Sequence, residues 1–301
     1  MNEIAVMFPG RSELLAGAVA VPPSGPWAAR PARRLFSVCN LCHGPAKASH
    51  HLCWSCATAL GQLGTSVPRV VPIFLFALGS GAHSSLVGYK GSPSPAARAA
   101  RSEALAGLLQ VFLAKHRRCL LADAPRPVAL VPVPSTRGGR RSWGGTHPLV
   151  EVCRAAAAAA SSAVTAASPE HLPSSFEVLD VLRAAPTPPR RLLATRRGFA
   201  LDGEPITPAT RAIVVEDVFA SGSRALSAAA ALEEAGVDVA AVLPIGRLVR
   251  PEHNSVTAAF WRAVARAPAD AGRCCACTRR RGADACACAA DRLSVLSRLA
   301  A

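Results

Sequence analysis

Four cysteines are spaced in a pattern that suits a metal ion. They form two Cys-x2-Cys pairs separated by ten residues, Cys39 with Cys42 and Cys53 with Cys56. A single turn can aim both sulfurs of a pair the same way, and four thiolates form the tetrahedral set that structural Zn²⁺ accepts. Because the protein would fill all four positions, we expect a structural zinc and no catalytic water. A redox Cys-x-x-Cys pair and unrelated buried thiols are the alternatives.

Other histidines and cysteines lie near this pattern or near the C-terminus. With four thiols available, we expect the neighbouring His43, His50 and His51 to lie on the surface. The second cysteine group has Cys-x-Cys spacing inside an Arg-rich segment, so a second metal site and an oxidation-prone tail are both open. Its members are Cys274, Cys275, Cys277, Cys286 and Cys288.

Two adjacent acids precede a loop of small residues. Glu216 and Asp217 follow the apolar run "AIVV", and the loop extends from Ala220 to Ser223. We expect the acids at the carboxyl end of a buried strand, where ligands bind in open parallel sheets. The loop's N–H groups and the N-terminus of a helix beginning near Ser223 can bind phosphate, while the acids can accept hydrogen bonds from a diol. A ribose 5′-phosphate offers both groups. The alternative is a strand end with solvated acids and a Ser/Gly turn.

The segments that must position these residues alternate between strand and helix patterns. Apolar runs predict strands at 69–78, 128–134, 176–182, 212–218 and 238–246. Helical spacing or alanine content predicts helices at 97–115, at 149–164 and after the small-residue loop. Such alternation is typical of α/β proteins, so we expect a parallel sheet flanked by helices.

Composition and charge limit the classes of protein that fit. Half of the 301 residues are hydrophobic, which is enough for a sizeable core, and the net charge of +15 favours an anionic partner. A genome that prefers Arg and Ala codons would produce the same excess. No apolar run reaches the ~18 to 20 residues that cross a bilayer, so we expect no membrane insertion. The apolar run at 14–21 has the wrong charge order for a signal peptide, and we expect a cytoplasmic protein.

The acidic pair and its loop resemble the 5-phosphoribosyl-1-pyrophosphate (PRPP) binding motif of type I phosphoribosyltransferases. The wider pattern is similar to the ComF (competence protein F) subfamily, which sets a four-cysteine zinc module before such a domain. Three more stretches are similar to segments of that subfamily: "GYKG" at 88–91, "VPVPST" at 131–136 with its arginine-rich continuation, and "EEAGVDVAAVLPIGR" at 233–247. The resemblance covers roughly residues 39–250.

The resemblance implies the type I phosphoribosyltransferase fold and displacement of pyrophosphate from C1 of Mg²⁺-bound PRPP by a nitrogen base. It implies that Glu216 and Asp217 are the catalytic acids that hold the ribose diol. The 5′-phosphate would lie on Ala220, Ser221, Gly222, Ser223 and Arg224. The pyrophosphate side would be formed by Ser135, Thr136, Arg137, Arg140, Arg141 and Lys90. At Ala220 and Arg224 the family usually has hydroxyl residues.

The predicted organisation has four parts. They are a loosely ordered leader at 1–34, a zinc module at 35–62, a phosphoribosyltransferase-like domain at 69–250 and a partly disordered Ala/Arg/Cys-rich tail at 262–301. We expect the domain to bind PRPP or a ribose-5-phosphate ligand, and transfer to a nitrogen base is one outcome. A sensor without turnover is one alternative. A DNA-uptake accessory is another, binding single-stranded DNA through the zinc module and Arg190, Arg191, Arg196 and Arg197.

Overall fold

The computed structural model describes residues 19–20, 36–64, 67–121, 127–135, 146–165, 176–203, 206–207 and 210–265. The expected leader lies outside these residues except for positions 19–20. The expected tail lies outside them beyond residue 265, together with its five cysteines.

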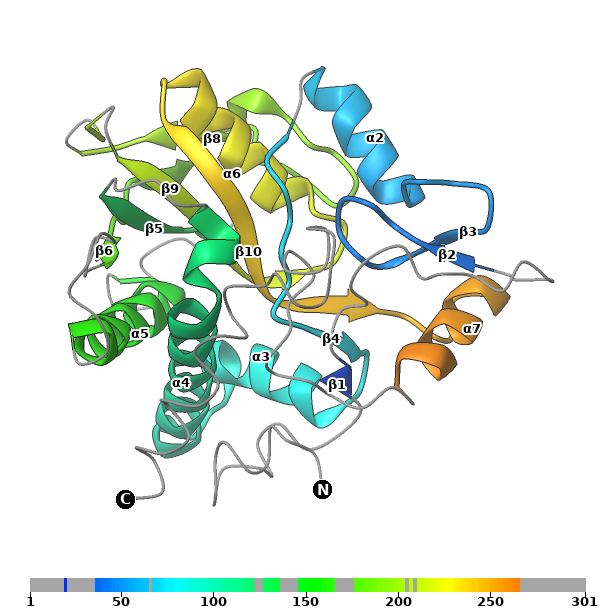
Figure 1. Ribbon diagram of the computed structural model, residues 1–301, viewed down its shortest axis with the longest axis horizontal. Helices are drawn as coiled ribbons and strands as arrows, with labels where there is room; N and C mark the ends of the chain where they lie inside the picture. The colour runs from blue at the N-terminus through cyan, green and yellow to red at the C-terminus, as the bar shows by residue number, and fades with distance from the viewer. Residues whose placement is uncertain are drawn as a thin grey trace.

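A central sheet of six strands in the order β1-β4-β10-β9-β5-β6 organises the fold (Figure 1). The strands are β1 (Val19–Ala20), β4 (Phe74–Ala77), β5 (Val128–Pro132), β6 (Phe176–Val178), β9 (Arg211–Phe219) and β10 (Asp238–Val249). The pairings from β4 to β6 are all parallel, and β1 is antiparallel to β4 at the edge. The prediction of an α/β protein with a parallel sheet is therefore confirmed.

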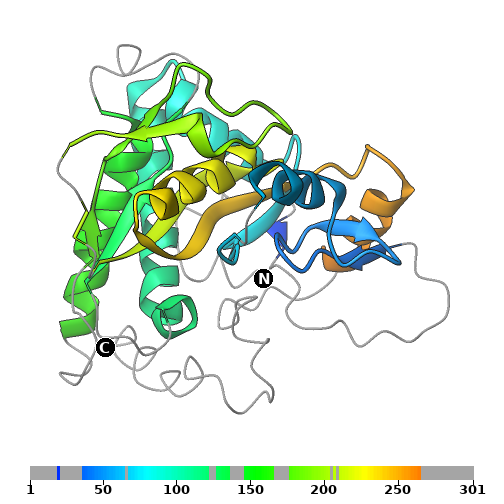
Figure 2. The same cartoon turned by 90° about the horizontal axis from the view of Figure 1, so that it is seen from above.

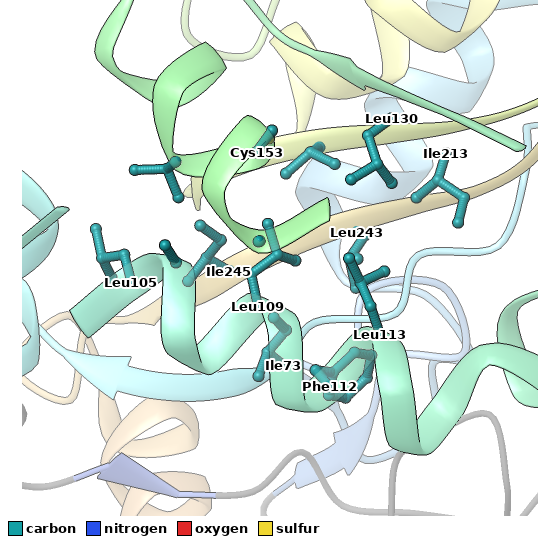
Figure 3. Close-up of a cluster of buried hydrophobic side chains, with 14 of the residues drawn as sticks. Ile73, Leu105, Leu109, Phe112, Leu113, Leu130, Cys153, Ile213, Leu243 and Ile245 are labelled. Atoms are coloured by element: carbon teal, nitrogen blue, oxygen red, sulfur yellow. The ribbon is translucent and has the colours of Figure 1, made fainter. Parts of the chain in front are cut away.

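Helices cover both faces of this sheet, which explains why its central strands are apolar on both sides. One face packs on α3 (Gly81–Gly91), α4 (Pro95–Leu121) and α5 (Pro148–Thr165), and the other on α6 (Ser223–Glu234) and α2 (Trp54–Leu63). Along β9, Ile213 belongs to the first core cluster and Val214 to the second, as strand alternation requires. Figure 3 shows Leu109 and Leu113 of α4 on the same side of the sheet as Ile213.

The cysteine-bearing segment is a small unit at one end of the sheet. It consists of an antiparallel ribbon, β2 (Phe36–Val38) with β3 (Pro45–Lys47), followed by α2. The last described helix, α7 (Ser255–Val264), lies against this ribbon (Figures 1 and 2), and the rings of Phe36 and Phe260 meet edge to face at 5.6 Å. The unit thus packs against a helix that follows the sheet in the chain. The last three residues of α7, 262–264, lie inside the region predicted as a tail.

The structure corrects several predicted boundaries. The strand expected at 69–78 is reduced to β4. Before Phe74, the pairing with β10 is limited to an isolated bridge between Val70 and Val242 and a few single hydrogen bonds, because Pro244 of β10 has no N–H to continue the ladder. The strand expected at 176–182 is divided between β6 and β7 (Leu182–Ala184), and β7 pairs with β8 (Phe199–Leu201) after the turn η3 (Arg196–Gly198) in a separate small sheet. The predicted helices are confirmed and are longer than expected; α4 has a non-helical residue at His116.

Candidate functional site

The four cysteines converge into one buried cluster, which we call the four-cysteine centre. The sulfurs of Cys39, Cys42, Cys53 and Cys56 all lie within 4.8 Å of one another, and Sγ of Cys42 is 3.8 Å from Sγ of Cys53. Four sulfurs this close can surround a single ion, and an all-thiolate set suits Zn²⁺ best among common metals. The predicted metal-binding group is therefore present, and zinc as its ion stays a prediction.

Tight local turns bring these sulfurs together. In the first pair, the N–H of Cys39 donates to the carbonyl of Gly44 and the N–H of His43 donates to the carbonyl of Cys39. His43 closes this turn with a left-handed backbone, φ 57°, and is buried, so the prediction of a surface histidine is wrong there. His50 and His51 are exposed as expected. In the second pair, Cys53 is the N-cap of α2 and Cys56 lies in its first turn.

The acidic pair lies inside β9, near its carboxyl end, in agreement with the strand predicted at 212–218. Glu216 and Asp217 are 2% and 4% exposed, which argues against solvated acids at a turn. Lys90 Nζ at the end of α3 is 2.5 Å from Asp217 Oδ2, and the hydroxyl of Tyr89 donates to the same oxygen at 3.1 Å. The Tyr-Lys dipeptide singled out in the sequence therefore lies directly against the acidic pair.

Arg224 connects the two acids. Its Nε is 3.3 Å from Glu216 Oε1 and its Nη2 is 3.9 Å from Asp217 Oδ1. The guanidinium meets both carboxylates, although successive side chains leave a strand in opposite directions. Nε and Nη2 are buried and have no hydrogen-bond acceptor among the described residues, so both remain available as donors. The resemblance places Arg224 with the residues of the 5′-phosphate and does not predict this contact with the acids.

The two carboxyl groups have opposite pKa shifts. Burial raises the pKa of Glu216 to about 7, and the nearby Arg224 only partly offsets this effect. Burial acts in the same direction on Asp217, but the charges of Lys90 and Arg224 outweigh it and lower the pKa to about 2. At neutral pH, Asp217 is therefore a fixed anion, while Glu216 exchanges a proton. Two neighbouring acids with separated pKa values are a feature of functional sites.

His147 is a third buried titratable group near these acids. It precedes α5, and its Nδ1 accepts a hydrogen bond from the N–H of Leu149 at 3.2 Å. Burial, followed by the positive charge of Lys90, lowers the pKa of His147 to about 4. The imidazole is therefore neutral at physiological pH and can act as a hydrogen-bonding group but not as a cation.

Opposite pH dependences of stability should follow from these shifts. Folding raises the pKa of Glu216. The contribution of Glu216 to the free energy of unfolding therefore falls as the pH rises from 4.5 to about 7. Folding lowers the pKa of His147. The contribution of His147 to the free energy of unfolding therefore falls as the pH drops from 6.5 to about 4. Urea unfolding across this range measures both effects. As the pH rises, the free energy of unfolding of Glu216→Gln relative to the parent should rise, and that of His147→Asn relative to the parent should fall. Each slope is at most about 1.4 kcal/mol per pH unit. Identical pH profiles for parent and variants would contradict these assignments.

The small-residue loop (Ala220–Ser223) follows β9 directly and leads into α6. Gly222 is the N-cap of α6 with φ 82°, and a Cβ there would lie 2.2 Å from Cζ of Phe219. Only glycine fits, for both reasons. Because Gly222 has no side chain to cap the helix, the amides of its first turn can serve another acceptor. The hydroxyls of Ser221 and Ser223 lie 3.0 Å apart beside them.

The pyrophosphate side is described only in part. Ser135 lies just beyond β5, the parallel neighbour of β9, where the N–H of Val133 donates to the carbonyl of Val215. Ser135 is therefore at the same edge of the sheet as the small-residue loop. Lys90 reaches Asp217 from α3. The remaining predicted residues, Thr136, Arg137, Arg140 and Arg141, lie outside the described residues.

A cavity of about 450 Å³ lies elsewhere, at the other end of α6. Glu234 and Ala235, where α6 ends, line it together with Phe199 and the arginines Arg196 and Arg197. Its position separates it from the acids and the small-residue loop, which lie at the N-terminus of α6.

No family model matches the chain, and no curated protein matches it significantly. Among the described residues, no helix is long and apolar enough to span a bilayer. The fold and the cysteine cluster define an α/β protein with a parallel sheet and a centre able to hold a metal ion.

Proposed function

We propose that the chain is a ComF-like protein of the type I phosphoribosyltransferase family, which binds PRPP or a ribose-5-phosphate ligand at the carboxyl end of β9. The observation that carries this proposal is the direct succession of the buried acids, the glycine-dependent loop and the uncapped start of α6. That succession offers carboxylates for a sugar diol and main-chain N–H groups for a phosphate, separated by a few residues.

Each described group has a distinct task in this proposal. The 5′-phosphate is bound by the amides and hydroxyls of Ser221 and Ser223, with Gly222 leaving room for it. The ribose hydroxyls reach Glu216 and Asp217 by displacing Arg224, because the guanidinium now lies against both carboxylates. Once displaced, Arg224 retains two buried donors that can turn to the ligand's phosphate.

Turnover would be a substitution at C1 of the ribose. The bond from C1 to the pyrophosphate oxygen breaks, a bond from C1 to the base nitrogen forms, and pyrophosphate leaves with its electron pair. Mg²⁺ would accompany the pyrophosphate of PRPP. Protein groups then act by placement and charge: Lys90 offsets the charge of the departing pyrophosphate, and Glu216, with a pKa of about 7, can take up a proton at neutral pH.

Ligand binding should weaken when both acids lose their charge. Calorimetric titration of PRPP with Mg²⁺ should show binding to the parent and at least about tenfold weaker binding to Glu216→Gln/Asp217→Asn, because both acceptors of the diol become amides. Asp202→Ala, which removes an exposed acid paired with Arg183, is the matched control and should bind as the parent does. Circular dichroism verifies folding of each variant. Equal binding by parent and double variant, or none by either, would rule out the pocket.

Two alternatives are separable from this proposal by further measurements. Pyrophosphate release with a panel of nitrogen bases distinguishes an enzyme from a sensor that binds the same ligand. The DNA-binding alternative relies on the arginines at 190–197, and of these Arg196 is engaged within the fold, where its Nε donates to the carbonyl of Leu63 at 2.7 Å. Oligonucleotide affinity that falls steeply with salt would favour DNA binding.

A further inference from the structure

Arg247 connects the four-cysteine centre to the small-residue loop. It lies near the carboxyl end of β10, opposite Phe219 in the parallel ladder, and is 6% exposed. Its Nε donates to Sγ of Cys42 at 3.4 Å. Its Nη1 donates to the carbonyls of Phe219 and Ala220 at 3.1 and 2.9 Å and also contacts the carbonyl of Leu248. A single guanidinium thus joins a sulfur of the centre to the first residue of the loop.

Packing holds this guanidinium in one position. It lies over the ring of Phe219, 5.4 Å from the ring centroid, and that ring fills the space beside Gly222. On the other side, a Cβ at Gly44 would lie 2.9 Å from Nη2 of Arg247. Gly44 belongs to the turn that holds Cys39, since its carbonyl accepts the Cys39 N–H. The contacts therefore continue from the cysteine turn, through Arg247 and Phe219, to Gly222.

Charge gives this connection a dependence on the metal. Four thiolates around one divalent ion carry a net charge of about −2, and a buried arginine next to one sulfur offsets part of it. Metal binding also supplies the folding free energy of small modules such as this one. When the ion is lost, Cys42 is no longer held in place, and Arg247 loses the acceptor that fixes its Nε.

We propose that Arg247 is a positioning residue that couples metal occupancy of the four-cysteine centre to the conformation of the small-residue loop. With metal bound, Arg247 holds the carbonyls of Phe219 and Ala220 and so fixes the loop that leads into α6. Without metal, the loop opens more often. The coupling itself needs no ligand; its effect on ligand affinity rests on the proposed function.

Amide hydrogen exchange of the full chain tests this coupling directly. In the parent, removal of zinc by a chelator should speed exchange in peptides covering residues 219–223 by about tenfold. In zinc-loaded Arg247→Met, the same peptides should already exchange about tenfold faster, and the chelator should add little. Loss of the chelator's effect in the variant is the signature of coupling, since a merely structural role would leave the two effects additive. Slow exchange of the loop in zinc-loaded Arg247→Met, or additive effects, would overturn the proposal.

Matched variants control for general destabilisation. Arg211→Met removes an arginine from the opposite end of β9, where it pairs with Asp238 at 2.8 Å, and should leave loop exchange and its response to chelator as in the parent. Gly44→Ala keeps Arg247 but pushes its guanidinium aside, so it should give the same result as Arg247→Met. It takes the place of Arg247→Met if the latter folds poorly. Peptides covering β5 report unfolding of the whole domain. If the chelator accelerated amide exchange in β5 as much as in the loop, the proposal would also be overturned.

Ligand affinity is a separate readout. Zinc-loaded Arg247→Met should bind ribose 5-phosphate about tenfold more weakly than the parent, while Arg211→Met binds it normally. If the parent binds neither PRPP nor ribose 5-phosphate, the proposed function fails, but the exchange experiment still decides on the coupling.

Discussion

Replacing Cys42 with serine is expected to cost the chain its metal and several kcal/mol of stability. Cys42 is fully buried in the four-cysteine centre, and a serine hydroxyl is a poor ligand for an ion otherwise held by thiolates. The ribbon of β2 and β3 has only three residues in each strand, which is too short to fold without further support. We therefore expect a bound ion to supply much of the folding free energy of this unit, and its loss to lower stability by about 4 kcal/mol or more.

Metal analysis and urea unfolding measure this effect together. The parent should contain about one zinc per chain, and Cys42→Ser should contain far less and unfold at lower urea. Cys153→Ser is the matched control, because Cys153 is equally buried but lies in α5, away from the centre. It should keep the metal and lose only about 1 to 2 kcal/mol for burying a hydroxyl. A metal-free parent that is as stable as the metal-treated protein would refute a structural metal.

Local sequence patterns were sufficient to predict the cysteine cluster. Each Cys-x2-Cys pair is closed by a turn of a few residues, so its geometry depends on near neighbours in the chain. The position of the small-residue loop was predictable for a similar reason: the apolar run of β9 and the alanine-rich α6 mark both of its ends. The spacing did not reveal that His43 is buried, because its left-handed backbone is a property of the closed turn.

Strand boundaries were less predictable, because pairing depends on distant partners. The acids belong to β9 since β10 continues alongside them, and Glu216 pairs with Pro244 in that ladder. The predicted strand at 212–218 already included both acids, and β9 exceeds it by one residue at each end. Conversely, Leu182 is apolar and was predicted to continue the strand at 176–182, but it pairs with Leu201 in the separate sheet of β7 and β8.

The partners of the acidic pair lie beyond what sequence reasoning can reach. Tyr89 and Asp217 are 128 positions apart, and Arg247 and Cys42 are 205 apart. The resemblance singled out the Tyr-Lys dipeptide, but it placed Lys90 on the pyrophosphate side and did not predict the contacts with Asp217. Arg247 ends the stretch at 233–247 that resembles a family segment, but nothing in that stretch predicted that the fold would place a thiol beside it.

Asp217→Asn is expected to destabilise the chain by about 3 kcal/mol at neutral pH, because it leaves Lys90 as a nearly buried cation without its counter-ion. The asparagine oxygen can still accept from Tyr89, so the loss is chiefly one of charge. The pKa of Asp217 is lowered to about 2, so its favourable contribution is present above pH 3.8 and is lost as the pH falls toward 2. Urea unfolding at pH 7 and at pH 3 should therefore show a smaller difference between parent and variant at pH 3.

A second substitution separates the ion pair from the role of the carboxylate as a ligand acceptor. Lys90→Met removes the uncompensated cation, so Lys90→Met/Asp217→Asn should be more stable than Asp217→Asn alone, with a coupling free energy of about 2 kcal/mol. Ligand affinity should not recover with it, because the diol still lacks the charged acceptor and the pyrophosphate now lacks a cation. If stability and affinity recovered together, Asp217 would serve only to neutralise Lys90, and the acidic pair would hold the fold together without binding a sugar. If neither changed, the contact at 2.5 Å would have no energetic weight in solution.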